Sequence, residues 1–237
     1  MNENIKEIIK AFKVDLDSSK NQIMLKPIAR SFNNQAHQIN EAAEKIHELI
    51  KNAPYSNDNI VLKRNEIKEA FFSPFKPQLK NAQVFLSHSH ADRNKALEVK
   101  DYLESQTKRK VFIDSLFWDY KDDVLNELAK YDCISRIEDA FTLILRESLQ
   151  DMIEKCPYFV FLQSSNSVSF NQNLLKITYS AWIYEELKIA HSISKDYLTL
   201  SFEQEQGLEI KIENDISPFL KSFETITLNE LSQQINS

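Results

Sequence analysis

The sequence predicts an α/β fold, in which the strands of a parallel sheet alternate with helices. From about position 81 onward, short apolar runs end at a polar residue, as buried parallel strands often do. Stretches with helical periodicity separate these runs. Alternation of this kind predicts a parallel sheet that has helices on both faces and right-handed crossovers.

The expected elements follow one another along this part of the chain. Strands are expected at Val84–Ser87, Lys110–Asp114, Tyr158–Gln163, Tyr197–Phe202 and Thr225–Leu228. Helices are expected at about Asn94–Gln106, Lys121–Lys130, Leu143–Lys155, Trp182–Ile193 and from Asn229 onward. Ligands of such sheets bind at the carboxyl ends of the strands. The polar residues that end the apolar runs are therefore candidate site residues.

The part of the chain before this pattern is expected to be helical. One apolar stripe at the helical spacing i, i+3, i+4, i+7 is formed by Ile5, Ile8, Ile9 and Phe12. A longer helix is expected from about Pro27 to Asn52. It carries a weak heptad-like seam of Phe32, Ala36, Ile39, Ala43, Ile46 and Ile50. This seam fits a helix pair packed within its own domain, and it also fits a dimerising coiled coil.

A domain boundary is expected just before the α/β pattern begins. A short helix at Arg64–Phe72 is followed by Pro74 and Pro77, which remove backbone donors and end regular structure. We therefore expect a helical N-terminal region over residues 1–78 and an α/β domain over residues 79–237.

Composition excludes several classes of function. The one glycine, Gly207, rules out the glycine-rich phosphate loop and the G-x-G-x-x-G dinucleotide turn. The net charge of −6 argues against nucleic acid as a partner. The sequence has neither a signal peptide pattern nor an apolar run long enough for a membrane span, which predicts a cytoplasmic protein without a membrane partner. Cys133 and Cys156 lack the spacing of a zinc site, so free thiols are expected.

Polar residues at the ends of three strands form the candidate site. They are Ser87, His88, Ser89, Asp114, Ser115 and Ser164. His88 and His90 resemble a metal pair, but no further ligands converge on them in the sequence, so no metal site is expected. Trp118 would either stack on a base or fill the core of an insertion.

Four segments in order resemble the Toll/interleukin-1 receptor (TIR) domain, especially small bacterial TIR proteins. They are Val84–Asp92, Val111–Ser115, Tyr158–Ser165 and Ser180–Leu187. The likeness covers about residues 81–237 and implies a flavodoxin-like sheet of five parallel strands. It also implies that Glu186, four residues after Trp182, is the residue that cleaves NAD, and that Trp182 lines the pocket.

The resemblance implies an enzyme that releases nicotinamide from NAD and leaves ADP-ribose or a cyclic ADP-ribose isomer. Nicotinamide departs as a neutral base, so one carboxylate suffices and no general acid is needed. NAD is the substrate, and no cofactor is expected. Because Glu186 and Trp182 are one helical turn apart, we expect Glu186 to face the crevice and Glu185 to face solvent.

Bacterial relatives act in antiphage defence, which implies self-association through the TIR domain and the N-terminal helices, together with a phage trigger or a downstream effector. The alternative is a TIR adaptor without catalytic activity that acts by TIR–TIR association. The position of Glu186 favours the enzyme, because an adaptor needs no carboxylate there.

Overall fold

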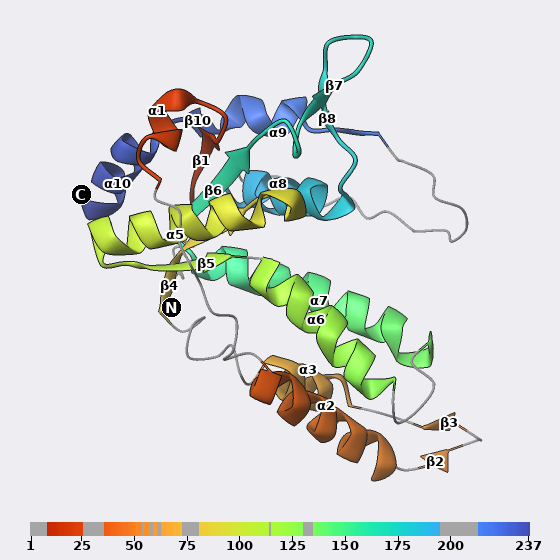
Figure 1. Cartoon of the computed structure of the whole chain (residues 1–237). Helices are drawn as coiled ribbons and strands as arrows, with labels where there is room; N and C mark the ends of the chain where they lie inside the picture. The colour runs from red at the N-terminus through yellow and green to blue at the C-terminus, as the bar shows by residue number, and fades with distance from the viewer. Residues whose placement is uncertain are drawn as a thin grey trace, which may run out of the picture. The chain divides into compact units, whose positions relative to one another are not determined.

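The computed structural model describes nine stretches of the chain. They are residues 9–25, 36–53, 55–56, 59–60, 63–72, 81–113, 115–129, 135–194 and 213–237. The chain divides into two compact units, shown together in Figure 1. The first unit comprises Met1–Ile28, Ala82–Asp114 and Gln150–Ser237. The second comprises Ala29–Asn81 and Ser115–Leu149, and each unit is described by itself below.

The first unit is built on a five-stranded parallel sheet in the order β10-β1-β6-β4-β5. The strands are β1 (Lys10–Asp15), β4 (Ala82–Ser87), β5 (Lys110–Ile113), β6 (Tyr158–Gln163) and β10 (Glu224–Thr225). The predicted α/β class and parallel sheet are therefore confirmed. The strand expected at Tyr197–Phe202 lies outside the described residues, and the last strand ends earlier than expected because Leu228 begins a helix.

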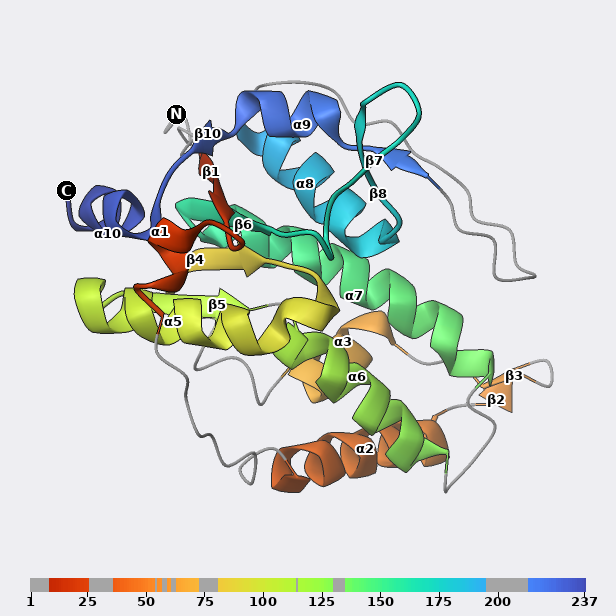
Figure 2. The ribbon, with the colours of Figure 1, turned by 45° about the horizontal axis from the view of Figure 1, so that its top comes forward.

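Helices flank this sheet on both faces (Figure 2). They are α1 (Ser19–Gln22), α5 (Arg93–Thr107), the end of α7 (Ser135–Lys155), α8 (Ala181–Ser194), α9 (Ser217–Ser222) and α10 (Leu228–Asn236). Helix α5 packs against α10, whereas α8 packs against β1 and α9. A small antiparallel sheet joins β7 (Ser169–Phe170), β8 (Lys176–Thr178) and β9 (Asn214–Asp215).

A row of phenylalanine rings crosses the sheet and forms part of its core. Phe85 lies opposite Phe112 on β5 and opposite Phe159 on β6, with 5.7 Å between ring centroids in both pairs. Phe223 continues the row with its ring edge against Phe159. Strands β4 and β6 are buried along most of their length, which explains their continuous apolar sequences.

Strand β1 corrects the expectation of a helix at the N-terminus. Phe12 and Val14 are buried and alternate with more exposed neighbours, which is the period of a strand. The strand pairs with β6 along its whole length, from Lys10 opposite Tyr158 to Asp15 opposite Gln163. The expected boundary between residues 78 and 79 is therefore wrong, because the sheet contains a strand from before it. Ile5 and Ile8 lie outside the described residues.

Strand β1 occupies the place in the sheet that the sequence assigned to the strand expected at Tyr197–Phe202, which lies outside the described residues. Flavodoxin-like sheets have the order 2-1-3-4-5. Applied to the five strands expected from the sequence, this order places Tyr197–Phe202 between β6 and the last strand. In the structure β1 occupies that position between β6 and β10. Numbered along the chain, the five strands lie in the order 3-2-4-1-5, which differs from 2-1-3-4-5 because β1 lies between β6 and β10.

Lys13 anchors β1 to the segment that leads into β10. Its Nζ donates hydrogen bonds to the carbonyl oxygens of Leu220 and Phe223, at 2.5 and 3.0 Å. These carbonyls lie at the carboxyl end of α9, where backbone acceptors lack helical partners. Burial lowers the pKa of Lys13, and the positive charge of Lys176 lowers it further.

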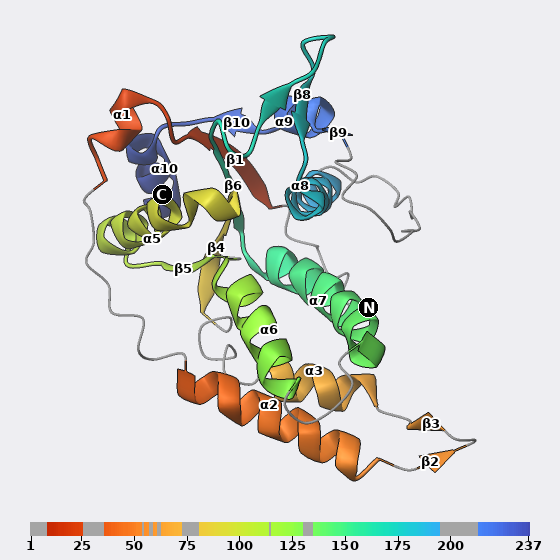
Figure 3. The same ribbon diagram turned by 45° about the vertical axis from the view of Figure 1, so that its right-hand side comes forward.

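The second unit is a helical cluster shown in Figure 3. It contains α2 (Ala36–Lys51), α3 (Arg64–Phe72), α6 (Ser115–Leu128) and the first part of α7. Helix α2 packs against both α3 and α6, and its seam residues Ala43 and Ile46 are buried. This packing favours the helix pair within one chain over the coiled coil. Two antiparallel strands of two residues each, β2 (Tyr55–Ser56) and β3 (Asn59–Ile60), lie between α2 and α3 in sequence.

The edge strand β5 is protected by two side chains from α5. Glu104 Oε1 accepts the backbone N–H of Val111 at 3.0 Å, and Lys100 Nζ donates to the Val111 carbonyl at 2.7 Å. The two side chains also form an ion pair with each other at 2.5 Å. Backbone groups on sheet edges can pair with other chains, so this contact blocks the edge of β5 at Val111.

We expect Glu104→Gln to destabilise the protein by about 1 kcal/mol at neutral pH. Burial alone would raise the pKa of Glu104, but the hydrogen bonds from Lys100 and Val111 together with the charges of Lys100 and Lys110 outweigh it and lower the pKa below 4.5. The carboxylate therefore contributes stability above its unfolded-state pKa, and this contribution disappears as pH falls through the lower native value. Urea unfolding at pH 7 and pH 3 measures this, with Glu98→Gln on the same helix as the control. An equal loss at both pH values would contradict the role of the charge.

Among the helices that the structure describes, none is long and apolar enough to cross a lipid bilayer. Cys156 is a buried free thiol, and burial raises its pKa to about 12. It is therefore protonated and unreactive in the folded protein. Cys133 lies outside the described residues.

Candidate functional site at the carboxyl edge of the sheet

The connections between strands identify one position at the carboxyl edge of the sheet where a ligand is expected to bind. From β4 the chain continues to β5 on one side, whereas from β6 it continues to β10 on the other side. Strands β4 and β6 are neighbours, so the connections diverge between them. Ligands of open α/β sheets bind at this divergence, outside the carboxyl ends of the strands. The strands end there at Ser87 and Gln163.

Three of the predicted site residues lie buried at this edge. Ser87 is 0% exposed, His88 is 3% exposed and Ser164 is 4% exposed. Ser89 is half-buried. In the part of the chain that the structure describes, the Ser87 hydroxyl has no hydrogen-bond partner. A buried hydroxyl without a partner is unusual in a folded protein, and water or a ligand commonly supplies the missing bond.

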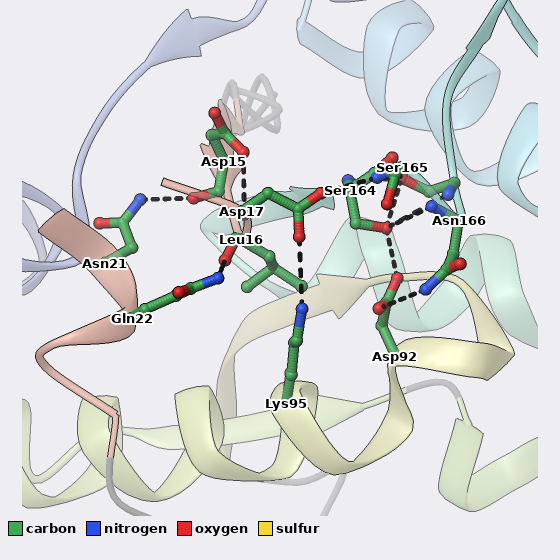
Figure 4. Close-up of polar contacts among 11 residues, drawn as sticks. Asp15, Leu16, Asp17, Asn21, Gln22, Asp92, Lys95, Ser164, Ser165 and Asn166 are labelled. Carbon is green, nitrogen blue, oxygen red and sulfur yellow. Dashed lines mark hydrogen bonds and ion pairs between the residues drawn. The ribbon is translucent and has the colours of Figure 1, made fainter. Parts of the chain in front are cut away.

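A network of hydrogen bonds joins the loop after β4 to the turn after β6 (Figure 4). Asp92 accepts a short hydrogen bond from the Ser164 hydroxyl and a second one from the Asn166 side-chain amide, at 2.9 Å. The Ser164 oxygen in turn accepts the backbone N–H groups of Asn166 and Ser167, at 3.1 and 3.2 Å. The two loops beside the divergence are therefore fixed to each other.

The loop after β1 reaches the same turn from the other side (Figure 4). Asp17 accepts the backbone N–H of Ser165 at 2.9 Å, and Lys95 donates to its other oxygen at 3.3 Å. The N–H bond from Ser165 is the main cause that lowers the pKa of Asp17. Because the N-terminus was expected to be helical, sequence reasoning did not assign Asp17 to this edge.

Helix α8 carries the acidic pair that the sequence singled out. Its first turn is capped by Ser180, whose Oγ accepts the backbone N–H of Ile183 at 3.2 Å. Trp182 is half-buried, and Glu186 is 0% exposed one turn later. A fully buried carboxylate is rare in proteins and costs free energy, which makes Glu186 a candidate functional group.

The two glutamates differ in their surroundings. Glu185 forms an ion pair with Lys188 at 3.7 Å, and its side chain is 20% exposed. Glu186 is 0% exposed, so its carboxylate is closed off from solvent, and the expectation that it faces a crevice stays a prediction. Glu185 was expected to face solvent, and it does so only in part, because its side chain lies against the helix where it pairs with Lys188.

The remaining predicted site residues lie in the second unit or outside the described residues. Asp114 lies outside the described residues. Ser115 begins α6 and Trp118 lies in its first turn, both in the second unit. The side chains of both residues lie outside the described part, so their predicted contacts with substrate stay predictions.

Two surface hollows of the first unit lie away from the predicted site residues. One, of about 490 Å³, is lined by residues 224–226 and by α10. The other, of about 410 Å³, is lined by residues 9–12 together with Ser194, Ser222, Glu224 and Gln234. Within the described residues, no three His, Cys, Asp or Glu side chains gather as a metal site.

Comparisons of the chain with protein-family models, with curated proteins and with solved structures find no match.

Proposed function

We propose that this protein is a TIR-like enzyme that cleaves the bond between nicotinamide and ribose in NAD. The observation that carries the proposal is the Glu186 carboxylate, which is 0% exposed and lies one helical turn after the half-buried Trp182. The order of the four sequence segments supports it, as does the five-stranded parallel sheet with helices on both faces. Water then bonds to the ribose carbon and loses a proton to give ADP-ribose, or an atom of the same molecule bonds there to give a cyclic isomer, and nicotinamide leaves in both cases.

The chemistry suits a site that has one carboxylate. As nicotinamide leaves, positive charge develops on the ribose ring, and a nearby carboxylate stabilises it. A buried carboxylate does this better than an exposed one, because water does not screen it. Ser87, whose buried hydroxyl has no partner within the described residues, is available to accept or donate a hydrogen bond to the ribose or phosphate of NAD.

The Glu186 carboxylate is buried in this structure, so NAD cannot reach it without a change in conformation. NAD must reach the carboxylate, so catalysis needs a state in which this side chain is more exposed than it is here. We propose that self-association supplies this state, with the helices of the second unit responding to a phage trigger or to an effector. The resemblance to bacterial defence proteins supports this role.

The proposal is tested by incubating the full-length protein with NAD, with and without a crowding agent, and separating the products by chromatography. We expect nicotinamide release that rises under crowding, because assembly exposes the site. Release would be accompanied by ADP-ribose or its cyclic isomer in equal amount.

One observation favours the adaptor as the second candidate. Neither of the two surface hollows described above is lined by Glu186 or Trp182, as expected of a protein that acts by association rather than by binding NAD. No nicotinamide release under any assembling condition would favour the adaptor over the enzyme.

A further inference from the structure

We infer that Asp92 is a positioning residue that holds together the two loops on which NAD would lie. This inference rests on the proposed function and gives a role to Asp92, which ends the first of the four segments but was not among the predicted site residues. Asp92 comes from the segment after β4, and its hydrogen-bond partners come from the turn after β6. It therefore bridges the divergence at which α/β sheets bind their ligands.

Asp92 is buried, so its carboxylate depends on hydrogen bonds from the protein rather than from water. The residue is 3% exposed, and each of its two carboxylate oxygens accepts one hydrogen bond from a side chain of the turn after β6. A buried charge is costly unless donors satisfy it, and here both donors belong to the neighbouring loop. Loss of the acceptor would leave the Ser164 hydroxyl buried without its partner.

Asp92 occupies the N-cap position of α5, but its side chain does not cap that helix. An aspartate at this position usually accepts an N–H from the first turn of its own helix. Here the carboxylate is directed to Ser164 and Asn166 instead. Its hydrogen bonds therefore connect two loops rather than stabilise the helix that it begins.

The same geometry changes the expected role of Ser164. The sequence predicted that this residue contacts the substrate. Its hydroxyl donates to Asp92 and accepts from the backbone N–H groups of Asn166 and Ser167. A serine hydroxyl has one donor and two acceptor positions, so all of them are used within the protein. Ser164 thus shapes the turn after β6, and Asp92 fixes that turn beside Ser87–Ser89.

Loss of the Asp92 carboxylate is expected to weaken NAD binding and to leave the rate of bond cleavage nearly unchanged. A substrate that lies across the carboxyl edge contacts both loops, so misplacing one of them weakens binding. Glu186 lies on α8, whereas Asp92, Ser164 and Asn166 belong to the segments after β4 and β6. We therefore expect Asp92→Asn to raise KM for NAD about tenfold or more and to leave kcat within about threefold.

The experiment compares full-length Asp92→Asn with wild type and with Asp101→Asn, a control further along α5. It measures KM and kcat for nicotinamide release, NAD affinity in a Glu186→Gln background, and Tm. Support consists of a raised KM with matching loss of NAD affinity, with Asp101→Asn unchanged. The double variant with Ser164→Ala should show less than the sum of the two single effects, because both substitutions weaken the contact between residues 92 and 164.

The outcomes separate this inference from the proposed function. A lower Tm with an unchanged KM would give Asp92 a purely structural role and overturn the inference alone. Wild-type protein that neither binds nor cleaves NAD would overturn the inference and the proposed function together. If Asp92→Asn does not fold, Asn166→Ala removes one of the two bonds from an exposed partner, and an unchanged KM in that variant would also overturn the inference.

Discussion

Glu186→Gln is expected to lower the rate of nicotinamide release by about 10²–10³-fold, as loss of a charge-stabilising group does in other enzymes. Glutamine has almost the same shape as glutamate but carries no negative charge, so it fills the same buried position without stabilising the cationic ribose. The measurement is the initial rate of nicotinamide release under the crowding condition that activates the wild-type protein.

Glu185→Gln is the matched control for this variant, because the two residues are adjacent on α8. It removes the ion pair with Lys188, which lies near the surface and contributes little to stability. Its rate should stay within about twofold of wild type, since Glu185 has no part in the proposed chemistry. Undiminished release by Glu186→Gln would refute the assignment of the catalytic residue, whatever the control shows.

Loss of β1 is expected to unfold the first unit. A chain that begins at residue 79, the domain boundary expected from the sequence, lacks the strand between β6 and β10. It would leave β6 with one open edge, because β1 pairs with β6 from Tyr158 to Gln163. We expect this fragment to be insoluble or to lack cooperative unfolding, because a sheet interrupted in this way loses both backbone pairing and core.

A point variant tests the same strand within the whole protein. Val14 is 0% exposed, and Val14→Asp places a charge in the core, at an expected cost of about 4 kcal/mol or more. Typical domains have only about 5–15 kcal/mol of stability, so most of it would be lost. Ile23→Asp, at an 82% exposed position, is the control and should change stability little. Chemical unfolding followed by circular dichroism measures both, and equal stability of the two variants would contradict a buried central β1.

The sequence predicted the elements whose local pattern agrees with their surroundings. Strand β6 and helix α3 have the expected bounds, because a continuous apolar run and a proline-terminated helix each have one plausible structure. At β1 two patterns overlap. Ile9 and Phe12 fit a helical stripe, whereas Phe12, Val14 and Leu16 alternate as a strand does. Pairing with β6 and β10 decides between them, and these partners lie far away in the sequence.

In the candidate site, too, local sequence predicts some residues, whereas others depend on distant partners. The ends of β4 and β6 could be found from the sequence, since polar residues follow apolar runs there. The roles of Asp92 and Asp17 could not, because each depends on a partner more than 70 residues away, as with Asp92 and Ser164, which are 72 positions apart. A motif shows which residues are present, but not which of them use their hydrogen bonds within the protein.

The central place of β1 also governs when the protein can fold during synthesis. Strand β1 leaves the ribosome before its neighbours β6 and β10, and the bond from Lys13 to Phe223 spans 210 positions. Contacts this distant form slowly, because the intervening chain must first be brought together. The nascent chain therefore carries the apolar face of β1 unpaired until β6 and β10 have been translated, which makes it a natural client for chaperones.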